Sequence, residues 1–103
     1  MSHEVLRVAT YNVHRCRGLD GRVQPERIAE VLRELEADVI ALQEVLSRPG
    51  GPPQADQARF LAASLGYHYA RGATRAFRGA IYGNVVLSRF PIVRVRHYDL
   101  SVA

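Results

Sequence analysis

The feature that most constrains the fold of this chain is a pair of apolar, β-branched segments with one amphipathic segment between them. Residues 5–13 (VLRVATYNV) show no helical period and predict a strand. Residues 38–45 (DVIALQEV) predict a second strand, with so few polar residues that both faces should be covered. Between them, apolar side chains recur at helical spacing: Ile28, Val31, Leu32 and Leu35. Pro25 suits the first turn of that helix. Strand, helix and strand in this order predict a right-handed crossover with parallel strands.

The remainder of the chain predicts a second helix and three further strands. Residues 46–54 (LSRPGGPPQ) predict a loop. Helical spacing then returns at Ala58, Leu61, Ala62 and Leu65, and Gly66 is well placed to end that helix. The strand candidates that follow are residues 67–72 (YHYARG), 84–88 (NVVLS) and 93–100 (VRVRHYDL). The predicted fold class is α/β, with the order β-α-β-α-β-β-β.

Length and composition limit the classes of protein to consider. With 103 residues, 48% of them hydrophobic, the chain has the size and composition of one globular domain. Its apolar runs are short and bounded by charges, which predicts no membrane span, and the N-terminus shows no signal peptide. Cys16 is the only cysteine, which excludes an internal disulfide and favours a reducing compartment. We therefore expect a cytoplasmic protein.

The basic residues are unusual in kind. All fourteen are arginine, and the formal net charge is +4. Arginine binds phosphate through a bidentate fork, so this composition suits a phosphate-containing ligand. A genome that disfavours lysine codons would give the same composition. A net charge of +4 is by itself only a weak indication of nucleic-acid binding.

Two polar residues close the predicted parallel strands. Asn12 ends the first and Glu44 ends the second, at the sheet edge where open α/β folds bind ligands. Strict alternation would place Glu44 on the same face as Ile40 and Leu42, opposite Val45. A carboxylate on a buried strand is expected to be paired or to hold a metal. From the residues alone, Glu44 could equally face solvent or pair with an arginine, and Asn12 could simply begin a turn.

Residues 71–84 (RGATRAFRGAIYGN) combine arginines with aromatic residues and glycines. Arginine beside an aromatic ring can hold a phosphate and stack on a base. The arginines in question are Arg71, Arg75 and Arg78. The alternative interpretation of this segment is a solvated loop between two strands.

Three segments resemble successive motifs of the endonuclease/exonuclease/phosphatase superfamily: RVATYNVH (7–14), DVIALQEV (38–45) and YGNVVLSRFPI (82–92). The resemblance covers nearly the whole chain in the family's order. It implies half of a four-layered α/β sandwich like that of DNase I. It also implies a metal-dependent phosphohydrolase, most simply a phosphodiesterase or nuclease, in which a metal-activated water attacks a phosphate ester.

The resemblance also implies roles for individual residues. Asn12 and Glu44 match the family's ligands for catalytic Mg²⁺, with Mn²⁺ as the alternative ion. Mg²⁺ suits such a site because it prefers hard oxygen ligands, retained water and substrate phosphate. Candidates for contact with the substrate phosphate are Asn84, Arg78 and His14. DNA, RNA, inositol phosphates and phospholipids are all substrates within the family, so the partner is a phosphate ester, with nucleic acid as one case.

The chain departs from the family in length and in its catalytic base. The family's domain is more than twice as long, and its second half carries an Asp-x-Asn pair and an Asp-His pair that supplies the base. Neither pattern occurs in residues 1–103. We therefore expect the N-terminal portion of the domain, with the base beyond Ala103 and a missing half or a second copy covering the sheet. The alternatives are an inactive half-domain that binds phosphate ligands, or a self-associating structural fragment.

Overall fold

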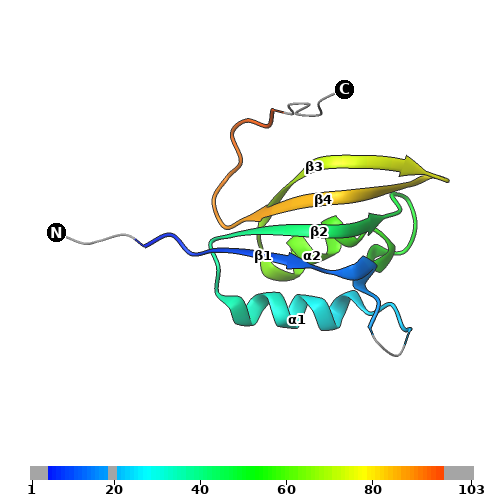
Figure 1. The fold of residues 1–103 in the computed structure, drawn as a ribbon, viewed down its shortest axis with the longest axis horizontal. Coiled ribbons are helices and arrows are strands. Elements are labelled where there is room, and N and C mark those ends of the chain that lie inside the picture. The colour runs from blue at the N-terminus through cyan, green and yellow to red at the C-terminus, as the bar shows by residue number, and fades with distance from the viewer. Residues whose placement is uncertain (1–4, 19–20, 97–103) are drawn as a thin grey trace, which may run out of the picture.

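The computed structural model describes residues 5–18 and 21–96, which form one mixed sheet of four strands and two helices (Figure 1). The strands are β1 (Val8–Asn12), β2 (Val39–Ser47), β3 (His68–Phe77) and β4 (Ala80–Ser88). The helices are α1 (Pro25–Leu35) and α2 (Gln57–Leu65), and two 3-10 turns are η1 (His14–Cys16) and η2 (Pro53–Ala55). Across the sheet the strands lie in the order β1-β2-β4-β3.

The first crossover has the predicted parallel strands. β1 pairs with β2 from Val8 opposite Val39 to Asn12 opposite Gln43. β2 then pairs antiparallel with β4, and β4 with β3. The interpretation of residues 71–84 as a loop is wrong, because most of them form the β3–β4 hairpin. Its turn is Arg78 and Gly79, both at positive φ (47° and 78°), as a tight two-residue hairpin requires.

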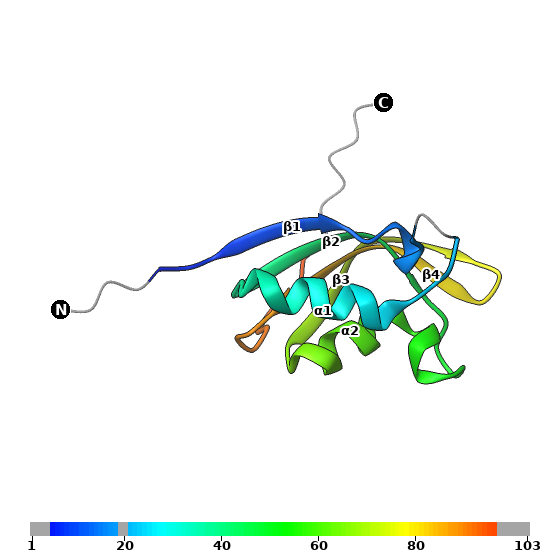
Figure 2. The same ribbon diagram turned by 90° about the horizontal axis from the view of Figure 1, so that it is seen from below.

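Both helices cover the same face of the sheet, so the described residues form two layers with one core between them (Figure 2). In α1, Ala29 and Leu32 are buried in this core and Ile28 packs against it, whereas Leu35 is 39% exposed. The predicted helix is therefore confirmed, and its core-facing side includes Ile28 and Leu32 as predicted, gains Ala29 and excludes Leu35. The sheet contributes alternate residues of its two central strands to the core: Ile40, Leu42, Val45, Val85 and Leu87. Gly66 ends α2 in the left-handed conformation, as predicted (φ 72°).

The last strand candidate, residues 93–100, is not borne out where the structure describes it. Residues 93–96 form no strand, and residues 97–100 lie outside the described part of the chain. Instead, residues 92–96 run across the face of the sheet opposite the helices, over β2, β3 and β4. That open face carries apolar side chains in contact with water, since Val8 is 65% and Val86 37% exposed.

Candidate functional site

The site begins with Asn12, the last residue of β1. Its side-chain Oδ1 accepts a hydrogen bond from the His14 backbone N–H (2.9 Å), and its Nδ2 donates to Glu44 Oε2. A backbone donor on one side and a carboxylate acceptor on the other leave only one orientation of the amide that satisfies both. Asn12 therefore starts a turn, as one interpretation of this residue held, and contacts Glu44 at the same time.

Glu44 lies at a bulge in β2, and this corrects its predicted face. Leu42 is opposite Val85 and Val45 is opposite Gly83, so Gln43 and Glu44 together face the single residue Asn84. The extra residue reverses the alternation, and Val45 (1% exposed) occupies the core face in place of Glu44. The side chain of Glu44 thus turns to the open face, and β2 continues for three residues beyond it, to Ser47. The predicted meeting of Asn12 and Glu44 is confirmed.

The Glu44 carboxylate is held in its ionised form. Hydrogen bonds from Asn12 and from the Tyr82 hydroxyl lower its pKa, and the nearby His14 and Arg15 side chains add to this effect. The Tyr82 hydroxyl donates to Oε1 at 3.1 Å, and His14 Nδ1 lies 3.5 Å from Oε2. The Glu44 side chain remains 36% exposed. The site is therefore an accessible negative charge with a fixed orientation.

The turn that follows Asn12 has an unusual backbone. His14, Arg15 and Cys16 have φ of 51°, 55° and 58°, three consecutive non-glycine residues in the left-handed region. Each such residue costs about 1–2 kcal/mol relative to a right-handed conformation. This backbone directs His14 and Arg15 into solvent while Cys16 is buried in the core. Burial, with a smaller contribution from Glu26, raises the pKa of the Cys16 thiol to about 12.

Two residues of this cluster, Tyr82 and Arg15, were not predicted from the residue pattern. Besides its bond to Glu44, Tyr82 places its ring 5.2 Å from the Arg15 guanidinium carbon. Tyr82 begins the third motif, and Arg15 directly follows the first, so the available signals were motif membership for Tyr82 and adjacency to a motif for Arg15. Pattern alone could not pair them, because 67 positions separate residue 15 from residue 82.

The predicted phosphate candidates divide into near and distant residues. His14 contacts Glu44, and Asn84 is exposed on the neighbouring strand, opposite the bulge. Arg78 lies at the hairpin tip, four positions before Tyr82, where its carbonyl accepts a hydrogen bond from Arg48 (3.5 Å). Arg71 pairs with Asp56 (3.4 Å) and its side chain is 28% exposed, so its guanidinium has a structural partner.

The Asn12–Glu44 pair offers oxygen atoms of the kind that a divalent cation such as Mg²⁺ prefers. An ionised carboxylate offers about four lone-pair positions, and Asn12 Oδ1 has a second lone pair besides the one used by His14. Mg²⁺ is typically bound by one or two carboxylates together with water and phosphate. In residues 5–18 and 21–96, no three His, Cys, Asp or Glu side chains gather as a metal cluster, so the fit rests on this pair.

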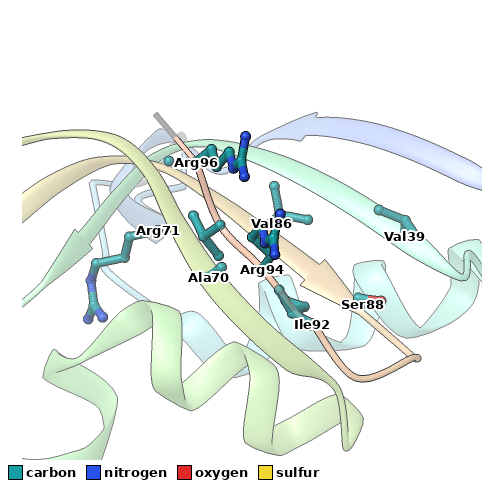
Figure 3. A pocket seen from close by; sticks show the side chains of 10 residues that line it. Val39, Ala70, Arg71, Val86, Ser88, Ile92, Arg94 and Arg96 are labelled. Atoms are coloured by element: carbon teal, nitrogen blue, oxygen red, sulfur yellow. The ribbon is translucent and has the colours of Figure 1, made fainter. Parts of the chain in front are cut away.

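A hollow elsewhere on the open face is not part of this site. It lies between the sheet and residues 92–96 and is lined by Val39, Ala70, Val86 and Ile92 together with arginines (Figure 3). Neither Asn12 nor Glu44 lines it.

Among the described residues, no helix is long and apolar enough to cross a membrane.

Comparison with known proteins identifies the family. The model of the Endonuclease/Exonuclease/phosphatase family matches residues 9–102. The chain is 30% identical over 105 residues to "Uncharacterized protein YbhP" of Escherichia coli K12, an alignment that covers 93% of this chain and 41% of that protein. A protein of the same name from Shigella flexneri matches equally.

Two solved structures are similar. One is an endonuclease/exonuclease/phosphatase from Beutenbergia cavernae, with a TM-score of 0.67 and 33% identity over 87% of this chain and 27% of that one. The other is a family protein from Leptotrichia buccalis, with a TM-score of 0.62 and 22% identity over 85% of this chain and 38% of that one, which shows the fold alone. This chain therefore spans about two-fifths or less of the length of these relatives. The chain belongs to the endonuclease/exonuclease/phosphatase family.

Proposed function

We propose that this chain supplies one side of the active site of a Mg²⁺-dependent phosphohydrolase, with a phosphodiester as substrate and Mn²⁺ as the alternative ion. The observation that carries the proposal is the contact between Asn12 and Glu44, in which Asn12 Nδ2 donates to an accessible, ionised carboxylate and the amide oxygen of Asn12 lies beside it. In this proposal residues 1–103 are the N-terminal portion of a DNase I-like domain, and the sheet is half of a four-layered sandwich.

Glu44 and Asn12 are the residues that would hold the cation. When bound, Mg²⁺ supplies positive charge that stabilises the negative charge developing on a phosphate under attack by water. Asn12 and Tyr82 orient the carboxylate through their hydrogen bonds, and the same bonds, that of Asn12 first, keep it ionised by lowering its pKa. We assign the water-activating base to no residue of the described chain.

Substrate phosphate would be positioned by groups on the rim of the pair. The side chains of His14 and Arg15 are exposed beside Glu44 and face it from the left-handed turn. Asn84 offers an amide from the adjacent strand. Arg78, at the hairpin tip, would reach only an extended substrate such as a nucleic-acid strand. A phosphate ester is thus the proposed substrate class, and the fold itself does not select among its members.

The proposal is tested by metal binding and hydrolysis measured on the purified chain. Mn²⁺ binding followed by electron paramagnetic resonance, with Mg²⁺ as competitor, should fall at least about tenfold in Glu44→Gln, or about 1.4 kcal/mol. Glu34→Gln is the matched control, because it makes the same charge change at an exposed position of α1. Hydrolysis of bis(p-nitrophenyl) phosphate with Mg²⁺ and with chelator is the second measurement, and we expect none from residues 1–103, because no residue of the described chain is assigned as the base.

The outcomes separate the alternatives. Equal Mn²⁺ binding by the two variants would refute the assignment of Glu44 as a ligand. Metal binding without hydrolysis would favour a half-domain that binds phosphate ligands and needs further chain for chemistry. Salt-sensitive binding to nucleic acid, weakened by Arg78→Gln, would then identify that ligand, because phosphate contacts release counterions.

A further inference from the structure

Gln57, the first residue of α2, lies beneath the site and is only 3% exposed. Both ends of its side-chain amide are hydrogen-bonded. Oε1 accepts from the Leu46 backbone N–H at 3.0 Å, and Nε2 donates to the Arg15 backbone carbonyl at 2.7 Å. A buried amide with both groups satisfied by backbone partners holds those partners at a fixed separation.

The two partners belong to the two segments that carry the site. Leu46 is two residues beyond Glu44 on β2, and Arg15 directly follows His14 in the left-handed turn. Arg15 is 42 positions from Gln57 and Leu46 is 11, so only the tertiary fold brings the three together. One side chain therefore links the backbone of the Asn12 turn to the backbone of the Glu44 bulge.

Each linked segment lacks a regular partner at the point where Gln57 contacts it. The pairing of β1 with β2 ends at Asn12 opposite Gln43, so the Leu46 N–H lies beyond the end of that ladder. The Arg15 carbonyl belongs to a residue with φ of 55°, a conformation that persists only where surrounding contacts hold it. The start of α2 is itself anchored, because Ser47 Oγ accepts from the Ala58 N–H at 3.1 Å in the buried interior.

We propose that Gln57 is a positioning residue for the Asn12–Glu44 site. It holds the turn of His14 and Arg15 against the bulge in β2, so that Asn12, His14 and Glu44 stay in contact. The positioning is a property of the apo chain, and its meaning for metal binding rests on the proposed function. Gln57 itself contacts neither the metal site nor substrate, and it acts through backbone groups.

The test is native-state hydrogen exchange of single backbone amides, with Gln57→Met and Gln57→Glu compared with Ser47→Ala. Gln57→Met keeps the length of the side chain and removes both bonds. The Leu46 and His14 amides should then lose protection at least about tenfold more than the Leu42 amide in the middle of the sheet. Gln57→Glu keeps the acceptor for Leu46 and loses the donor to Arg15. It should loosen His14 and spare Leu46, and it serves as the second variant if Gln57→Met does not fold.

Ser47→Ala is the structural control, because it weakens the anchor of α2 without touching Arg15. It should lower protection evenly across the sheet. If Gln57→Met also lowers protection evenly, or if Gln57→Glu loosens Leu46 and His14 alike, the positioning role is refuted.

Mn²⁺ affinity is the second readout, and it should fall about tenfold in Gln57→Met, as for other residues that orient metal ligands. A wild-type chain that binds no Mn²⁺ would refute the proposed metal site, and the exchange pattern would still decide the positioning role. Normal Mn²⁺ binding by the wild type, with unchanged affinity and exchange in Gln57→Met, would refute the positioning role and leave the metal site standing.

Discussion

The two halves of β2 are made from similar residues but have different structural roles. From Val39 to Leu42 the strand alternates regularly, pairs with a strand on each side and buries Ile40 and Leu42 completely. From Gln43 to Ser47 it carries a bulge, a residue at φ 57° and a carboxylate bound by side chains of two other strands. The first half is a core strand, and the second half presents a charge on the open face.

The difference shows how one extra residue converts a buried strand into a site. A bulge at this position keeps an apolar residue, Val45, on the core face and releases Glu44 to the other side without ending the strand. β3 has a second bulge opposite the same residue of β4, between Arg71 and Thr74. Asn84 is therefore flanked by an extra residue on each side, and the site forms where both ladders are interrupted.

Substitutions in the regular half of β2 should lower the free energy of unfolding most. Leu42→Ala removes a side chain that is 0% exposed and should lower the free energy of unfolding by about 2–5 kcal/mol, because the packed core cannot collapse around the cavity. Urea denaturation measures the loss. Leu46→Ala, in the same strand beyond the bulge and only partly buried, is the matched control and should cost clearly less. Equal losses would mean that the two halves share one packing environment.

The second prediction concerns the backbone that accommodates the bulges. Gly83 has φ of 151°, and a Cβ at this position would lie 2.3 Å from the Ala73 carbonyl oxygen. Gly83→Ala should therefore lower the free energy of unfolding by about 1–3 kcal/mol, through overpacking against backbone. Gly72→Ala is the control, since its Cβ would meet Asn84 at an ordinary 3.5 Å. Thermal unfolding of both variants decides the point, and the explanation fails if Gly72→Ala is as destabilising as Gly83→Ala.

The charge of Glu44 should have the smallest effect on stability, and this effect is measured as a pH dependence. Its pKa is lower in the folded chain than in an unfolded one, where it is about 4.3. Its contribution to stability is therefore present above that value and is lost as pH falls through the folded pKa. Stability measured from pH 7 down to pH 3 should fall less steeply in Glu44→Gln than in the wild type. The control Glu34→Gln should follow the wild-type slope, and a Glu44→Gln slope equal to both would show that the carboxylate is not stabilised by its neighbours.

Much of the framework was predictable because its signals are local. Helical spacing located α1 and α2, and a helix between two apolar strands predicted that β1 and β2 are parallel, which placed Asn12 near Glu44. The hairpin was missed because Gly72, Gly79 and Gly83 made residues 71–84 resemble a loop. Those glycines serve a bulge, a tight turn and a close approach between strands, and none of these shows in the spacing of apolar residues.

Residue patterns were sufficient to predict the family, the order of the elements up to β4 and the meeting of an amide with a carboxylate at one edge of the sheet. The folded arrangement was needed to establish which face Glu44 occupies, that Tyr82 and Arg15 join it, and that Gln57 links the two segments from below. The physical reason is that a bulge is defined by the register between strands some 40 positions apart. A buried amide likewise takes its partners from whatever backbone groups the folded chain leaves unpaired.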